Sequence, residues 1–234
     1  MTTYDLFVES GPRHKKTMVH VPSLLGCIAQ GPTTEEALAA APEAIRTFLV
    51  FLAAHGEKAN DAGASFDAAV AERATEGIWL GNGDPSIVFA SDVAPITPKE
   101  LETWTARWHA IRTETQALLA PLPAAAFTRE PANGRGAVRI VGHILGASPA
   151  YLRTFGPMTE LNRLARESED PAAARQKMAE STAATLALLR ALSSADRKAE
   201  HHRGSGLWTA RKTFRRLLEH EWEHHRELAS RLGE

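Results

Sequence analysis

Two histidines four residues apart near the C-terminus form the pattern with the clearest chemical meaning. They are His220 and His224, in the segment LLEHEWEHHREL. Side chains at this spacing lie on one face of an α-helix, so both imidazoles can reach a single ion. Two ligands alone make a weak site, and a further nitrogen or oxygen is needed. His143 is the third ligand that we predict, and it lies in the segment VRIVGHILG.

The apolar neighbours of His143 predict a largely buried helix, so we expect its imidazole in the interior, where a polar group requires a partner. The spacing on the last helix nevertheless leaves alternatives open. Counted around the helix, the apolar face centres near Leu218 and Leu228, and Glu221 and His225 lie nearer its middle than His220 does. A pair formed by Glu221 and His225, or a cluster of histidines that is merely solvated, fits the pattern as well.

Four helical segments must position these residues. The second half of the chain predicts helices over about residues 99–119, 137–155, 171–192 and 209–232. Proline and glycine residues separate the segments at spacings that let consecutive helices pack as neighbours. We therefore predict that residues 98–234 form an all-α, up-down four-helix bundle.

The first half, residues 1–97, predicts an α+β module. YDLFVES and TMVHVPSL predict two strands joined by the turn GPRHKK, and GCIAQG predicts a third strand. Thr33, followed by glutamates, predicts the start of a helix that runs to about Ala54 and covers the sheet. We expect a small antiparallel sheet with one packed helix. Pro95 and Pro98 mark the domain boundary.

Residues 57–96 give a weaker pattern. IWL and IVF flank the segment GNGDP, which predicts two further short strands joined by a turn. Residues 66–74 fit a helix equally well.

Composition argues against several functional classes. The 234 residues carry a formal net charge of -1, with 44% hydrophobic and 24% charged residues. Such a chain lacks the basic surplus that binds nucleic acid, so we expect no nucleic-acid partner. The single cysteine, Cys27, and the absence of a secretory pattern at the N-terminus predict a cytoplasmic location. The most apolar stretch, residues 44–54, is shorter than the ~20 residues of a spanning helix, so we expect no membrane segment.

The second half resembles the DinB-like superfamily of four-helix bundles. The signature of that superfamily is a histidine on the second helix and a His-x-x-x-His pair on the fourth, which His143, His220 and His224 match. The resemblance covers about residues 101–232. It implies a divalent ion, zinc or nickel first and iron as a further option, held by these histidines with open positions for water or substrate. It also implies that the chain can form a homodimer.

An open three-histidine site suits a Lewis-acid catalyst better than a structural ion, which a fourth protein ligand normally closes. A bound water would have a lowered pKa, or a small thiol would bind as thiolate, because some members of the superfamily are thiol-dependent transferases. We therefore expect a metal-dependent hydrolase or a transferase that uses a low-molecular-weight thiol. Glu221 and His225 are candidates for groups that orient the ligands or transfer protons.

The first 55 residues resemble the HicB-like antitoxin domain through the segment VHVPSLLGCIAQGPTTEEALAAAPEAI. Gly26, Cys27, Gly31 and Thr33 match the strand and turn of that family. The resemblance implies a small sheet with a packed helix, which in toxin–antitoxin systems can mask an RNA-cleaving toxin. The alternative function is therefore a non-catalytic binding protein whose first module engages a protein partner and whose metal steadies the bundle.

Overall fold

The chain divides into two compact units. Unit 1 comprises Met1–Thr97 and Arg197–Glu219, and unit 2 comprises Pro98–Asp196 and the chain from His220 onward. The first cut falls between Thr97 and Pro98, and the inclusion of Arg197–Glu219 in unit 1 is not evident from the sequence pattern. The computed structural model describes residues 1–11, 16–203 and 206–233.

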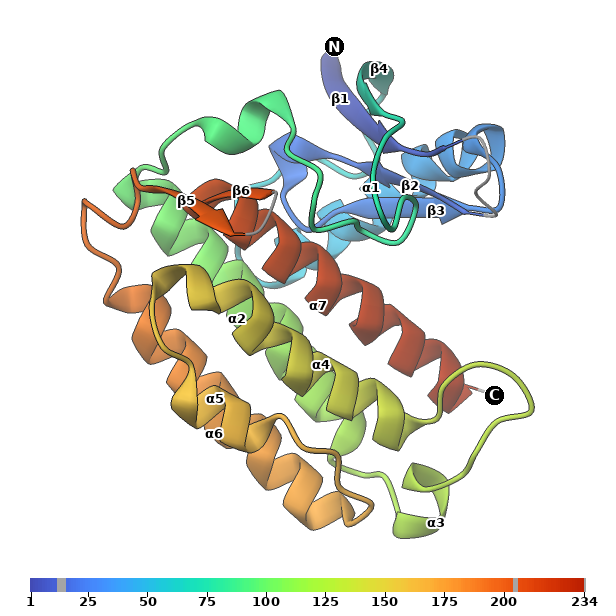
Figure 1. Ribbon diagram of the computed structural model, residues 1–234. Coiled ribbons are helices and arrows are strands. Elements are labelled where there is room, and N and C mark those ends of the chain that lie inside the picture. The colour runs from blue at the N-terminus through green and yellow to red at the C-terminus, as the bar shows by residue number, and fades with distance from the viewer. Residues whose placement is uncertain (12–15, 204–205, 234) are drawn as a thin grey trace. The chain divides into compact units, whose positions relative to one another are not determined.

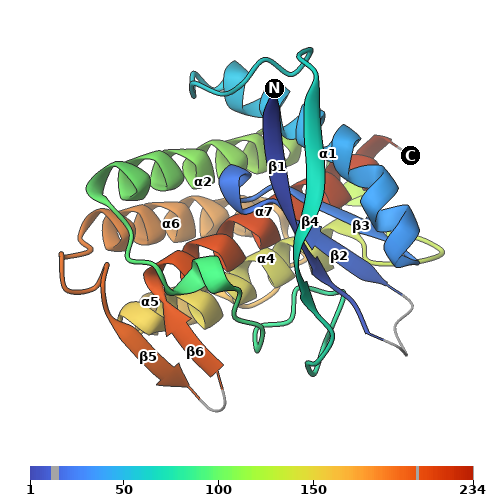
Figure 2. The ribbon, with the colours of Figure 1, turned by 90° about the horizontal axis from the view of Figure 1, so that it is seen from above.

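A mixed sheet forms the centre of unit 1. Its described strands are β1 (Thr2–Glu9), β2 (Thr17–His20), β3 (Ile28–Gly31) and β4 (Phe66–Ala74). Their order is β3-β2-β1-β4 (Figure 2). β2 pairs antiparallel with both neighbours, but β4 pairs parallel with β1. The prediction of an antiparallel sheet is therefore wrong for β1 and β4. The long connection between β3 and β4 includes a helix, which lets the chain return in the direction of β1. The turn predicted at residues 11–16 lies mostly outside the described residues.

The helix of that connection, α1 (Thr34–Ala54), begins and ends as predicted. The Thr33 side chain accepts a hydrogen bond from the Glu36 N–H, and the Glu36 carboxylate accepts one from the Thr33 N–H, which satisfies two amides at the helix start. By length and composition alone α1 could cross a membrane, with a mean hydropathy of 1.6 over its most apolar part. However, its buried face packs against β2 and β3, which is the arrangement of a core helix.

The two strands predicted from IWL and IVF do not form, and residues 78–89 are irregular. Asp84 organises this segment: its carboxylate accepts hydrogen bonds from the N–H groups of Trp79 and Ser86, and its own N–H donates to Glu9. These hydrogen bonds use backbone N–H groups that a pair of strands would need for the hydrogen bonds between them. Residues 66–74, which fitted a helix equally well, are β4.

A short hairpin and the start of the last helix complete unit 1. β5 (Glu200–Arg203) and β6 (Gly206–Thr209) pair antiparallel and lead into α7 (Ala210–Gly233). Two short 3-10 helices, η1 (Pro22–Leu24) and η2 (Ala90–Val93), lie in the loops.

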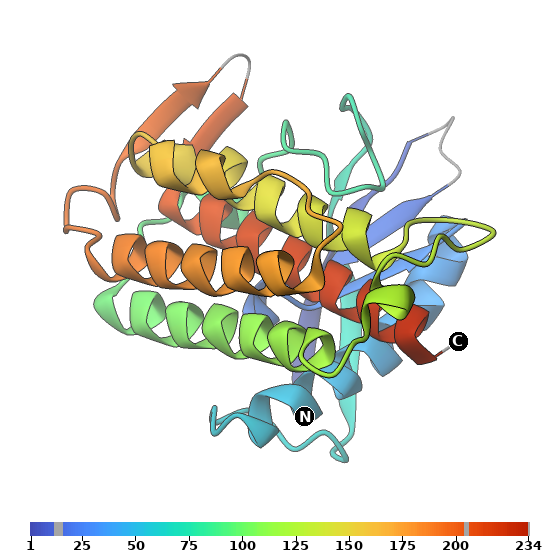
Figure 3. The same cartoon turned by 90° about the horizontal axis from the view of Figure 1, so that it is seen from below.

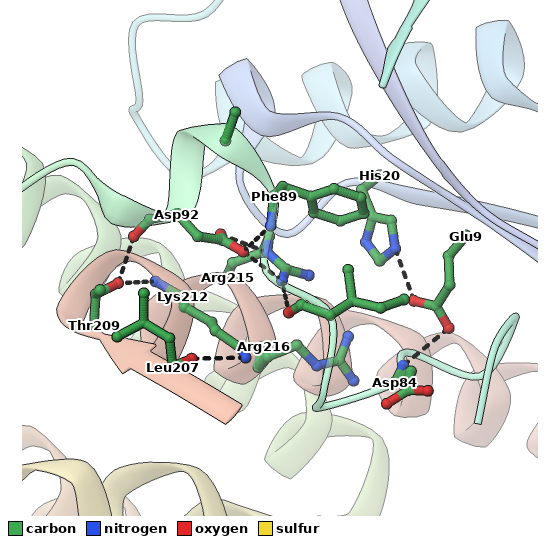
Figure 4. A network of polar contacts seen from close by, with 12 residues as sticks. Glu9, His20, Asp84, Phe89, Asp92, Leu207, Thr209, Lys212, Arg215 and Arg216 are labelled. Atoms are coloured by element: carbon green, nitrogen blue, oxygen red, sulfur yellow. Dashed lines mark hydrogen bonds and ion pairs between the residues drawn. The ribbon is translucent and has the colours of Figure 1, made fainter. Parts of the chain in front are cut away.

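Buried charged side chains bind the start of α7 to the sheet (Figure 4). Nε2 of His20 lies 3.2 Å from Glu9, and Nδ1 of His20 lies 2.8 Å from Glu219. Arg215 donates to both carboxylate oxygens of Asp92, at 2.8 Å each. All five side chains are buried. Because a buried charge without a partner is costly, these contacts explain why this part of the chain clusters with unit 1.

Unit 2 is helical. Its described helices are α2 (Pro98–Leu119), α3 (Ala124–Phe127), α4 (Ala137–Leu152), η3 (Arg153–Phe155), α5 (Thr159–Leu164), α6 (Pro171–Arg190) and the second half of α7. The four longest agree with the predicted segments to within a few residues. α6 packs against both α2 and α4 (Figures 1 and 3). Apolar residues of α2, α4, α6 and α7 share one core, which includes Leu119, Ile140, Ile144, Met178 and Leu228.

Candidate metal centre

Helices α4 and α7 bring three histidines of unit 2 together. His143 comes from α4, and His220 and His224 come from α7. One ligand nitrogen from each can be chosen so that all lie within 4.8 Å of one another. The Nε2 atoms of His143 and His220 are 2.9 Å apart. The three predicted histidines therefore lie close together.

His143 differs from expectation in its exposure. His220 and His224 are buried, whereas His143 is exposed. The apolar face of α4 is formed by Ile140, Val141, Ile144 and Leu145. With ~100° between successive residues, His143 points roughly 130° away from the centre of that face. It therefore lies at the border between α7 and solvent and not in the interior.

The protonation of His143 suits metal binding. Partial burial lowers its pKa, and the nearby His224 and Arg135 lower it further, to about 4. At neutral pH the imidazole is therefore uncharged and has a nitrogen lone pair to offer. A positively charged imidazolium could not act as a ligand.

Glu227 and Arg135 support His224. The Glu227 carboxylate lies 2.7 Å from Nδ1 of His224 and accepts hydrogen bonds from Arg135 at 2.6 and 3.1 Å. Burial alone would raise the pKa of Glu227, but the hydrogen bonds with His224 and Arg135 lower it to about 2. The Arg135 guanidinium also lies 3.2 Å from Nδ1 of His224 and can only donate, but the ionised carboxylate is closer and favours the tautomer with the proton on Nδ1. This tautomer leaves Nε2 of His224 as the ligand atom.

Neither of these two supporting residues was predicted from the sequence. Glu227 follows His224 by three residues on one helix, and this spacing could have identified it. Arg135 precedes α4 in a loop, and no sequence signal connects it with α7.

Glu221 and His225, the predicted supporting groups, have other neighbours. Glu221 accepts two hydrogen bonds from Arg112 of α2, both at 2.6 Å, and the pair is buried. Nδ1 of His225 lies 3.2 Å from the Thr115 hydroxyl, also on α2. These contacts direct both side chains toward α2, and the carboxylate beside His224 is that of Glu227 instead.

A pocket of about 490 Å³ opens beside His143. Its lining comes from the loop before α4, from α4 itself and from the segment between α5 and α6, and includes Arg135, Arg139, His143, Gly146 and Glu167. A small molecule in this pocket would contact the exposed imidazole of His143.

The sequence model of the DinB superfamily matches residues 107–228, just over half of the chain. The matched range contains His143, His220 and His224. This chain belongs to the DinB superfamily. Searches of the curated proteins and of the solved structures find no significant match. Proteins of the DinB superfamily commonly bind metal, and the donor set here fits a divalent ion, because it offers three imidazoles at short mutual distance.

Proposed function

We propose that this DinB superfamily chain is a divalent-metal-dependent enzyme, either a hydrolase or a transferase that uses a low-molecular-weight thiol. The observation that carries the proposal is the convergence of three histidine nitrogens within 4.8 Å beside an accessible pocket. His143, His220 and His224 would hold the ion, with zinc or nickel as first candidates and iron as a further one. In this proposal the four long helices form the up-down bundle of the superfamily.

A bound ion would supply Lewis-acid chemistry to an oxygen or sulfur atom of a ligand. The residues of the chain would prepare the site for it. Neutral His143 offers a ligand nitrogen and lines the pocket, and Glu227 fixes the ring of His224. Arg135 keeps Glu227 ionised, so the carboxylate remains an acceptor for the Nδ1 proton.

The accessible pocket favours a catalytic ion over a structural one. A structural zinc site is normally closed by four protein ligands. Within residues 1–11, 16–203 and 206–233, the candidate group consists of three histidines, and one of them is exposed. This arrangement supports an ion with a coordination position left for a ligand.

The alternative is a non-catalytic protein whose HicB-like first module engages a protein partner. The element order of unit 1 supports it, because β1, β2, β3, α1 and β4 form a small sheet with one packed helix. In this case an ion would only stabilise the helices, and its removal would lower the melting temperature sharply.

The first test is elemental analysis of protein purified without a histidine tag, beside the His143→Ala variant, before and after addition of zinc, nickel or iron. The proposal expects about one equivalent of metal in the wild type and its loss in the variant. A wild type that takes up no metal under any of these conditions would refute the enzyme proposal. The alternative, a non-catalytic protein that binds a partner through unit 1, would then remain.

A further inference from the structure

Two side chains of opposite charge line the pocket beside His143 without a protein partner. Arg139 lies on α4, four residues before His143, and Glu167 lies between α5 and α6. Both are exposed. Among the residues that the structure describes, neither makes a hydrogen bond or ion pair, with each other or with another group. Arg135, the third charged residue of the lining, is engaged by Glu227.

A glycine on α4 lets Glu167 lie against the helix. A Cβ atom at Gly142 would be 2.3 Å from Cγ of Glu167 and 3.1 Å from its Oε1. Any other residue at this position would therefore displace the Glu167 side chain from its place against α4. At Gly146, one turn further along α4, nothing lies within 4 Å of the corresponding position, so the pocket has room there.

We propose that this pocket binds the head group of an α-amino acid or of a molecule derived from one. Arg139 would pair with the carboxylate of the ligand and Glu167 with its ammonium group, while the ligand side chain would reach the proposed metal site through His143, which lines the pocket. This last contact rests on the proposed metal site, whereas the two charge contacts do not.

The charges select this class of ligand over others. A guanidinium binds a carboxylate through charge-assisted hydrogen bonds, and a carboxylate does the same for an ammonium group. A ligand with one charge makes only one of these two contacts, and a phosphate-like dianion would meet repulsion from Glu167. An α-amino acid carries both charges on one carbon atom and satisfies both residues.

Four thiols with related skeletons test the proposal on metal-free protein. L-cysteine carries both charges, 3-mercaptopropionate only the carboxylate, cysteamine only the ammonium group, and 2-mercaptoethanol neither. Titrations at pH 7 followed by calorimetry, and by the amide NMR signals of Gly142 and Gly146, should show cysteine binding about ten-fold more tightly than either singly charged thiol.

Two exposed variants assign the contacts. Arg139→Gln should weaken the binding of cysteine to the affinity that the wild type has for cysteamine. Glu167→Gln should weaken it to the affinity that the wild type has for 3-mercaptopropionate. Arg153→Gln is the matched control, because Arg153 is exposed just beyond the other end of α4 and outside the pocket lining. The proposal is overturned if wild-type protein does not prefer cysteine, or if the preference survives in both pocket variants.

Cobalt uptake, measured on the same proteins, separates this proposal from the metal site. Selective cysteine binding without cobalt uptake would refute the metal site and leave the amino-acid pocket standing. Stoichiometric cobalt uptake without selectivity would refute the pocket and leave the metal site. If both hold, cysteine should perturb the visible spectrum of bound cobalt more strongly in the wild type than in Arg139→Gln.

Discussion

Nδ1 of His224 lies 2.7 Å from the carboxylate of Glu227, less than one turn further along α7. Arg135 donates two hydrogen bonds to the same carboxylate from the loop before α4. The His224 ring is therefore oriented by a carboxylate on its own helix. That carboxylate is in turn held by the Arg135 guanidinium from another segment. A His-x-x-x-His pattern does not reveal this support.

Replacement of Glu227 tests the support. Glu227→Gln keeps the shape of the side chain but removes the charge that pairs with Arg135 and favours the Nδ1 proton of His224. We expect metal affinity to fall roughly 10- to 100-fold while full loading remains possible at high metal concentration. Competition with a chromophoric chelator measures this change. Glu102→Gln, at an exposed site on α2, should bind metal like the wild type. Unchanged affinity in Glu227→Gln would show that the carboxylate does not support the site.

Single alanine variants test the ligand set. His143→Ala, His220→Ala and His224→Ala should each lose metal during dialysis, because two imidazoles hold an ion weakly. His225→Ala should retain it, since that ring lies beside Thr115. Elemental analysis of the four dialysed variants gives the answer. Metal retained by His143→Ala and lost by His225→Ala would mean that α7 uses the Glu221 and His225 pair instead.

The sequence predicted that His220 and His224 lie close together because helical spacing is a local property. The positions of His220 and His224 on one helix follow from four residues of separation, and the long helices follow from apolar periodicity. The exposure of His143 could have been derived by counting around α4. A run of apolar neighbours suggested burial, but these neighbours occupy one side of the helix.

Features that depend on distant parts of the chain could not be predicted. Asp84 replaces a predicted hairpin with hydrogen bonds to Trp79 and Ser86, and its amide contacts Glu9, which is far away in the sequence. The buried contact between His20 and Glu219 joins residues from opposite ends of the chain. Nothing in the sequence around His20 or Glu219 indicates that the two side chains meet. The membership of residues 197–219 in unit 1 is therefore evident only from the structure.

The buried pair of Arg112 and Glu221 gives a prediction about stability. Arg112→Ala would leave the Glu221 carboxylate buried without its partner, and we expect a loss of about 3–5 kcal/mol in the free energy of unfolding. Urea denaturation of metal-free protein measures it. The double variant Arg112→Met/Glu221→Leu should recover most of the loss, because no charge then remains buried.

An exposed pair is the matched control for that experiment. Arg163 and Glu160 form an ion pair in solvent, so Arg163→Ala should change stability little. If Arg112→Ala behaves like Arg163→Ala, the Glu221 carboxylate must reach water when its partner is removed. The pair would then contribute little to the core of unit 2.

His20 predicts how the stability of unit 1 depends on pH. Burial alone would lower the pKa of His20, but the charge and hydrogen bond of Glu219, together with the hydrogen bond of Glu9, raise it above the ordinary value of 6.5, against an opposing effect of Arg215. A raised folded-state pKa gives stability that is fully present below pH 6.5 and is lost as the pH rises through the folded-state pKa. The advantage of wild type over His20→Gln should therefore be larger at pH 6 than at pH 9.

Thermal or urea unfolding of both metal-free proteins across this range measures the difference. Comparing the two proteins at each pH cancels the titration of groups they share, including the three histidines of the candidate metal site. His109→Gln is the matched control, because it removes an exposed histidine of α2 that lies outside this network. If the difference in the free energy of unfolding between wild type and His20→Gln stays constant from pH 6 to pH 9, His20 has the same charge in the folded and unfolded chains. Glu9 and Glu219 would then be neutralised by the arginines of α7 alone.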